Sequence, residues 1–180
     1  PLSGLFSGSL KLVGSFSNIK TYANLASDKV SLFNEPLDSL SIKLNVDKDD
    51  VEISNLFLKK NSSSISGNMR YDFGSGLSSI SLISTPIKLY DFYRYRDLGL
   101  GYNGYISFDI NAKSDKNLTG KANVFLTEAK VGNEVIGSSS LAISFVDKLL
   151  SFETKILDSD VTINGKLDLQ NKLPRINLNY

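Results

Sequence analysis

Apolar and polar residues alternate along most of this chain. From Gly104 to Ala112, every second residue is small or apolar, and the residues between them are polar. The same alternation recurs over residues 40–46, 141–145 and 161–169. Successive side chains of a β-strand point to opposite faces, so each segment predicts a strand with one apolar and one polar face. So many strands of this kind would form a long apolar surface, and something must cover it.

Short polar turns rich in Asp, Asn, Ser and Gly separate these segments. Residues of these types favour hairpin connections, which predicts an antiparallel sheet. We expect strands near residues 5–17, 21–26, 29–33, 38–47, 50–59, 64–73, 77–84, 102–113, 118–130, 134–146, 149–157, 161–170 and 174–180.

One segment, residues 85–96, breaks the alternation. The residues Leu89, Phe92, Tyr93 and Arg96 stand at helical spacing. Thr85 is a typical helix N-cap and Pro86 suits a first helical position, so the pattern predicts a short helix here. Its mixture of aromatic and Arg residues could stack on bases, lie at a membrane interface or bind a partner. We favour a helix that packs its apolar stripe on the sheet, with Arg94 and Arg96 facing water.

The parts of the chain before and after this segment resemble each other. Residues 65–71 match residues 163–169, and residues 8–12 match residues 104–108. This predicts one continuous unit with a first β repeat over 1–84, a helical linker over 85–98 and a second β repeat over 99–180. Repeats of this kind favour an elongated sheet.

Composition and charge exclude several kinds of chemistry. The 180 residues include no Cys, His or Trp, and 20 Lys and Arg balance 19 Asp and Glu to a net charge of +1. We therefore expect no thiolate, no His base, no zinc site and no nucleic-acid partner. The Asp residues at 47, 49, 50, 158 and 160 could form a calcium site or an acid/base pair, but turns explain them better. We predict that the chain is not an enzyme and has no catalytic, cofactor-binding or metal-binding residue.

No run of about 18 apolar residues predicts a membrane-spanning helix. The sequence begins at Pro1 without a signal peptide, and we expect it to be a fragment of a longer protein.

Three architectures accommodate the alternation. A β-sandwich would bury the apolar face as its core, and such a module could bind carbohydrate or act in adhesion, with Tyr93 and Tyr95 as its aromatic platform. An outer-membrane β-barrel would turn the same face to lipid. An open groove would keep it inside, where it needs an apolar guest.

The order of segments in the second half is informative. A strand that begins at Gly104 is followed by residues 118–124, a Ser-rich strand over 138–145, residues 149–152 and a final strand over 161–169. This order resembles the repeating C-terminal region of the TamB and AsmA-like envelope proteins, and residues 85–92 resemble the short helical break between their repeats. The resemblance covers most of the chain.

The resemblance implies an all-β fold: an elongated, curved, largely antiparallel sheet that forms an open U-shaped hydrophobic groove (a β-taco), with one short helix between two repeat-like halves. It also implies a location in the periplasm of a two-membrane bacterium and an inner-membrane anchor outside this fragment. The partners it implies are phospholipid acyl chains and an outer-membrane barrel of the Omp85 class. The implied activity is phospholipid transport between the two membranes, or assistance to outer-membrane protein assembly.

A groove of this kind would run for about 60 Å, and each methylene shielded from water would contribute about 0.8 kcal/mol. Its predicted lining is formed by the apolar residues of the alternating segments: Leu10, Leu12, Phe16, Leu40, Ile42, Leu44, Val46, Met69, Ile106, Phe108, Ile110, Val124, Leu141, Ile143, Phe145, Leu150, Phe152, Ile163, Leu167 and Leu169.

Overall fold

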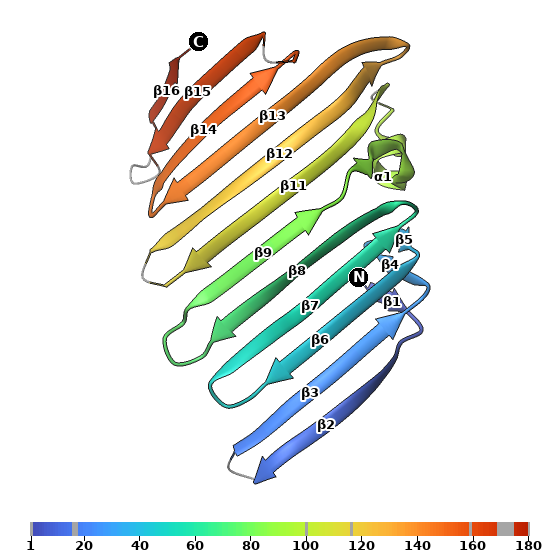
Figure 1. The fold of residues 1–180 in the computed structure, drawn as a ribbon, viewed down its shortest axis with the longest axis vertical. Coiled ribbons are helices and arrows are strands. Elements are labelled where there is room, and N and C mark those ends of the chain that lie inside the picture. Colours follow the sequence, from blue (N-terminus) through green and yellow to red (C-terminus); the bar gives the residue numbers. More distant parts are fainter. Residues whose placement is uncertain are drawn as a thin grey trace.

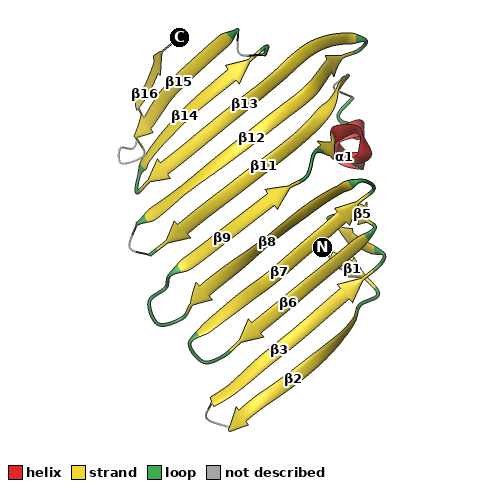
Figure 2. Cartoon of the chain, in the orientation of Figure 1, coloured by secondary structure: helices red, strands yellow, loops and turns green. Residues whose placement is uncertain are grey.

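The chain forms one large, open, curved antiparallel sheet (Figures 1 and 2). The computed structural model describes residues 2–15, 18–99, 101–115, 117–158 and 160–168, and the backbone of residues 175–179. Twelve strands follow one another in the order β16-β15-β14-β13-β12-β11-β9-β8-β7-β6-β3-β2, and the short β10 adds to the sheet beside β11. A separate small sheet has the order β1-β4-β5. The predicted fold class is confirmed.

The bounds of the elements in the main sheet are β2 (Ser7–Ser15), β3 (Asn18–Ser27), β6 (Ser39–Val46), β7 (Asp50–Lys60), β8 (Ser63–Asp72), β9 (Ser78–Ser84), β10 (Ile87–Lys88), β11 (Tyr102–Ser114), β12 (Leu118–Val131), β13 (Glu134–Val146), β14 (Leu149–Ile156), β15 (Val161–Asp168) and β16 (Arg175–Asn179). The small sheet consists of β1 (Leu2–Gly4), β4 (Val30–Leu32) and β5 (Glu35–Leu37). A 3-10 turn (Leu89–Asp91) and the helix α1 (Tyr93–Asp97) connect β10 to β11.

The pairing register places the apolar residues of successive strands opposite one another. Ile110 of β11 lies opposite Leu82 on one side and Ala122 on the other, and Ala122 lies opposite Ile143, which pairs with Phe152. Directly opposed residues of antiparallel strands share a face. The sheet therefore has one face to which the apolar positions belong, here called the apolar face, and an opposite polar face rich in Ser, Asn and Lys.

Bulges preserve this division where the alternation slips. Ile53 and Leu56 of β7 both belong to the apolar face although two polar residues, Ser54 and Asn55, separate them. The register of β7 shifts at this point against both of its neighbours, and β12 has a similar irregularity between Leu126 and Ala129. One extra residue in a strand realigns the side chains that follow it.

The sheet continues past the helical segment without interruption, because β9 pairs directly with β11. Six strands of the twelve-strand order precede this segment and six follow it. The division into two repeats remains a prediction.

Most of the buried residues gather at one rim of the sheet. There β5 lies against β7, and the 3-10 turn lies against β11. Buried residues at this rim are Ser27, Val30, Glu35, Leu40, Lys60, Ser63 and Ile87. The described residues thus form a small local core at this rim, here called the closed rim, and not a core that runs along the whole sheet.

The helix begins later than the sequence pattern predicts, and the prediction of Thr85 as its N-cap was wrong. The Thr85 N–H donates to the carbonyl of Ser64 (3.0 Å), and its hydroxyl accepts the Ser64 N–H (2.8 Å). These bonds keep Thr85 attached to β8, and the next residues pair with β11 as β10. Tertiary pairing therefore prevails over the capping preference of Thr85, and α1 starts at Tyr93 without a side-chain cap.

The short strands β1, β5 and β10 were not predicted, because segments of two or three residues are too short for an alternating pattern to register. Within the described ranges, no helix is both long and apolar enough to cross a membrane.

Candidate functional site: the apolar face

The structure places the predicted lining residues on a single face of the sheet. By their register, all those that lie in the described ranges belong to the apolar face, from Leu10 at one edge to Leu167 near the other. Phe16 and Leu169 lie outside the described residues. Sequence reasoning did not name further members of this face: Val51, Ile53, Leu56, Leu58, Ile65, Ile80 and Leu82. The signal that could have found them is the same alternation, continued through β7, β8 and β9.

This face is incompletely covered. Leu10 and Leu12 expose 66% and 60% of their surface, most of the other lining residues are half-buried, and Leu40 at the closed rim is buried. The chain exposes 12,200 Å² in total, whereas a compact protein of 19.7 kDa would expose about 8,600 Å². The excess is large for a folded monomer and marks an extended surface that could bind another molecule.

Hollows occur on both sides of the sheet. On the apolar face, one hollow of about 340 Å³ is lined by Val51, Ile53, Met69, Ile80 and other residues of β7 to β12. On the opposite side, two hollows of about 510 and 640 Å³ lie mainly against polar-face residues such as Lys121. A twisted sheet can be concave in both directions, so curvature alone does not distinguish the two sides. Hydrocarbon side chains distinguish them, because they line the hollow on the apolar face.

A buried ion pair holds the closed rim together. Lys60 of β7 donates to the carboxylate of Glu35 in β5 and to the carbonyl of Pro36 (2.9 Å). The Tyr93 N–H donates to the same carboxylate (3.0 Å), and the Lys60 ammonium lies 5.1 and 5.0 Å from the ring centroids of Phe92 and Tyr93. This cluster links the main sheet, the small sheet and α1.

Two neighbouring hollows lie at the closed rim. The first rim hollow, of about 320 Å³, opens between the small sheet and the main sheet, with Leu37 and Leu58 among its lining residues. The second rim hollow, of about 390 Å³, opens between α1 and the main sheet, with Leu98 and Ile106 in its lining. Both are mainly apolar, and together they extend the apolar face under the helical segment.

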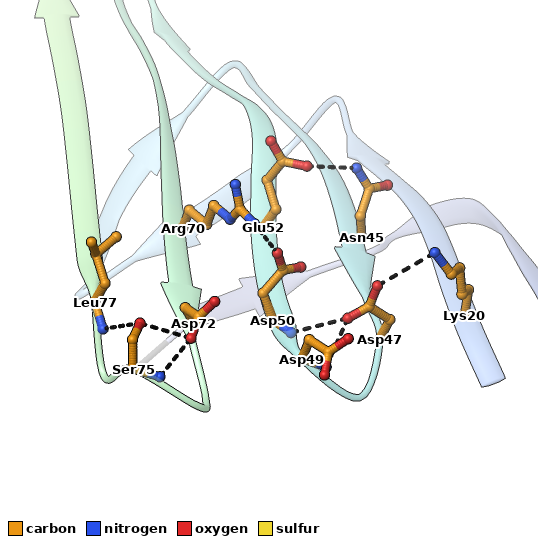
Figure 3. Close-up of polar contacts among 10 residues, drawn as sticks. All are labelled: Lys20, Asn45, Asp47, Asp49, Asp50, Glu52, Arg70, Asp72, Ser75 and Leu77. Carbon is orange, nitrogen blue, oxygen red and sulfur yellow. Dashed lines mark hydrogen bonds and ion pairs between the residues drawn. The ribbon is translucent and has the colours of Figure 1, made fainter. Parts of the chain in front are cut away.

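The acidic turns around Asp47 and Asp72 lie at the opposite rim, where their carboxylates stabilise hairpins (Figure 3). Asp158, in the turn between β14 and β15, accepts the backbone N–H of Ser138 (2.7 Å). Asp47 accepts the backbone N–H groups of Asp49 (2.8 Å) and Asp50 (3.0 Å), and these bonds hold the pKa of Asp47 below its ordinary value. Asp72 accepts the N–H (2.7 Å) and hydroxyl (2.8 Å) of Ser75, which lowers the pKa of Asp72 in the same way. Among the described residues, no group of three or more acidic side chains could hold a metal ion. These carboxylates act as turn caps.

The two tyrosines proposed as an aromatic platform have different surroundings. Tyr93 is exposed, and the guanidinium of Arg96 stacks over its ring at 4.5 Å. Tyr95 is half-buried in the second rim hollow and donates its hydroxyl to the carbonyl of Tyr102 (3.1 Å). Burial raises the pKa of the Tyr95 phenol above its ordinary value.

Comparison with protein-family models, with curated protein sequences and with solved structures found no match to this chain. The resemblance to the TamB and AsmA-like proteins therefore remains a prediction from the sequence.

Proposed function

We propose that this chain is a segment of a hydrophobic conduit whose apolar face shields phospholipid acyl chains from water. The observation that carries the proposal is the continuity of the apolar face over the twelve-strand sheet, together with the excess of exposed surface. Each acyl methylene moved from water onto this face would contribute about 0.8 kcal/mol. An acyl chain could slide along such a face with little change in buried area at each step, so transport would require no chemistry from the protein.

The cellular setting of the proposal rests on the sequence resemblance. It places the chain in the periplasm, between an inner membrane and an outer-membrane barrel of the Omp85 class, in phospholipid transport or outer-membrane protein assembly. The apolar face itself requires only a ligand with long hydrocarbon chains.

Photo-crosslinking in cells would test the proposal. A photoreactive residue would replace Phe108, which belongs to the apolar face opposite Val124, and in a matched strain it would replace Ser107, which belongs to the polar face opposite Phe125. We expect covalently attached phospholipid on position 108 and not on position 107.

Two outcomes would contradict the proposal. Lipid on neither position in a folded protein would mean that another protein surface covers the apolar face. Equal labelling of both positions would mean that lipid contacts the sheet without regard to its faces.

A further inference from the structure

Arg94 of α1 lies between the two rim hollows. Both hollows have Ile65, Ile87, Phe92 and Arg94 in their lining, so these four residues form the boundary that the hollows share. Ile65 belongs to the apolar face through β8, and Ile87 pairs with Ile106 of the same face. A cationic side chain thus stands where two apolar hollows meet at the closed rim.

The guanidinium of Arg94 has no protein partner within the described ranges: it makes neither a hydrogen bond nor an ion pair there. Its neighbour Arg96 differs, because that guanidinium stacks on Tyr93. Arg94 is also an exposed residue, so its charge is available to a ligand in solution.

Charge around the hollows favours an anion. The lining of the first rim hollow includes Lys59, Lys60 and Arg94 against the single acid Glu35, and Glu35 is paired with Lys60. Lys59 belongs by its register to the polar face, opposite Ser64, so Arg94 is the cation that remains unbalanced at this hollow. Among the described residues that line the second rim hollow, Arg94 is the one charged side chain.

We propose that Arg94 binds the phosphate of a two-chain lipid whose acyl chains enter the two rim hollows. This inference rests on the proposed function and adds a head-group site to it. A planar guanidinium binds phosphate oxygens through two parallel charged hydrogen bonds, and hollows of about 320 and 390 Å³ fall at the lower end of ligand-pocket sizes. Each hollow would hold part of one acyl chain, and Arg94 would hold the head group at the closed rim between them.

Binding of short-chain lipids that dissolve as monomers would test this site. Dioctanoyl phosphatidic acid and dioctanoylglycerol have the same chains and differ in the phosphate. We expect the natural chain to bind the phosphatidic acid more tightly in a calorimetric titration. Arg94→Gln should weaken that binding about tenfold or more, because a charged hydrogen-bonded pair is lost, and should leave the affinity for dioctanoylglycerol unchanged.

Lys11→Gln provides the matched control. Lys11 is an exposed residue of β2 on the polar face, opposite Tyr22, so the variant loses the same charge far from both hollows. Its affinity for both lipids should equal that of the natural chain. Circular dichroism would verify that both variants keep their strand content.

The outcomes separate the head-group site from the proposed function. If the natural chain binds neither lipid, the apolar face does not hold acyl chains and the proposed function fails. If it binds both but Arg94→Gln leaves them unchanged or weakens them equally, the head-group site fails while the proposed function stands. Competition by inorganic phosphate alone at the concentration of the lipid would identify a simple anion site and would also overturn the inference.

Discussion

Glu35 lies where three parts of the fold meet. It belongs to the small sheet, its carboxylate accepts the ammonium of Lys60 from β7, and it also accepts the backbone N–H of Tyr93 at the start of α1. The side chains of Glu35 and Lys60 expose only 10% and 9% of their surface. A buried charge left without its partner is strongly destabilising, so the energetic importance of this pair appears when one member is removed.

We expect Glu35→Ala to lower the free energy of unfolding by about 3–5 kcal/mol, because the Lys60 ammonium would remain buried with Pro36 as its protein acceptor. Urea denaturation followed by circular dichroism would measure the loss. Glu35→Gln is the control, because its side-chain carbonyl could still accept the Tyr93 N–H. Its free energy of unfolding should fall by less than that of Glu35→Ala. Equal losses in the two variants would show that the charge of Glu35 has no special role.

At the scale of residues, sequence reasoning found the apolar lining but not the closed rim. Lys60 is the one residue that could have indicated the closed rim, because the alternation after Leu58 assigns this charged residue to the apolar face. Its partner Glu35 lies 25 positions away in a three-residue strand that no local pattern predicts. The sequence predicts that Arg94 faces water. Its position between the two rim hollows results from tertiary packing, which no local pattern indicates.

At the scale of elements, the alternation predicted the long strands because each needs one apolar and one polar face. The turn residues predicted their hairpin connections, and Asp47 and Asp72 do stabilise turns through their carboxylates. The start of the helix could not be predicted from local sequence. Thr85 forms a backbone hydrogen bond with Ser64 of β8, and residues 87–88 pair with β11 as a strand. Local sequence preference determines the secondary structure of a segment only where no long-range strand pairing competes with it.

The hairpin carboxylates predict a specific pH dependence. The pKa values of Asp47 and Asp72 lie below their ordinary values in the folded chain, so both groups stabilise the fold at neutral pH. That contribution is fully present above the unfolded pKa and is lost as the pH falls below about 4 through the folded values. Thermal unfolding at pH 7 and pH 3 should show a smaller loss of Tm for the double variant Asp47→Asn with Asp72→Asn than for the natural chain.

The quantity to compare is the change in Tm between pH 7 and pH 3 within each chain, because the two Asn substitutions also alter the turns at neutral pH. Ser75→Ala would serve as a partial control, since it removes the hydroxyl donor to Asp72 and keeps the backbone donor. An identical pH dependence in the natural chain and the double variant would show that other carboxylates govern acid unfolding.

At the scale of the whole molecule, the sheet buries less surface than a compact protein of the same mass. An unfolded chain of 19.7 kDa exposes about 28,600 Å², so folding here buries about 16,400 Å² compared with about 20,000 Å² for a compact protein. The main sheet gains its cohesion mostly from neighbouring strands, since the large packing contacts join strands that pair directly.

We expect the urea m-value to be about a fifth smaller than that of a compact protein of 180 residues, because m scales with the surface exposed on unfolding. Measurements at several protein concentrations would reveal any contribution from association. An m-value typical of a compact protein at every concentration would mean that the apolar face is covered within the single chain.

The bulge in β7 has a consequence for how such a chain can change during evolution. A residue inserted into a strand turns every later side chain of that strand to the other face, unless a bulge like the one at Ser54 and Asn55 absorbs it. Gain or loss of a whole hairpin instead leaves the orientation of all other strands unchanged. Lineages of this sheet should therefore differ in length by pairs of strands, while single-residue insertions and deletions should accumulate in the turns.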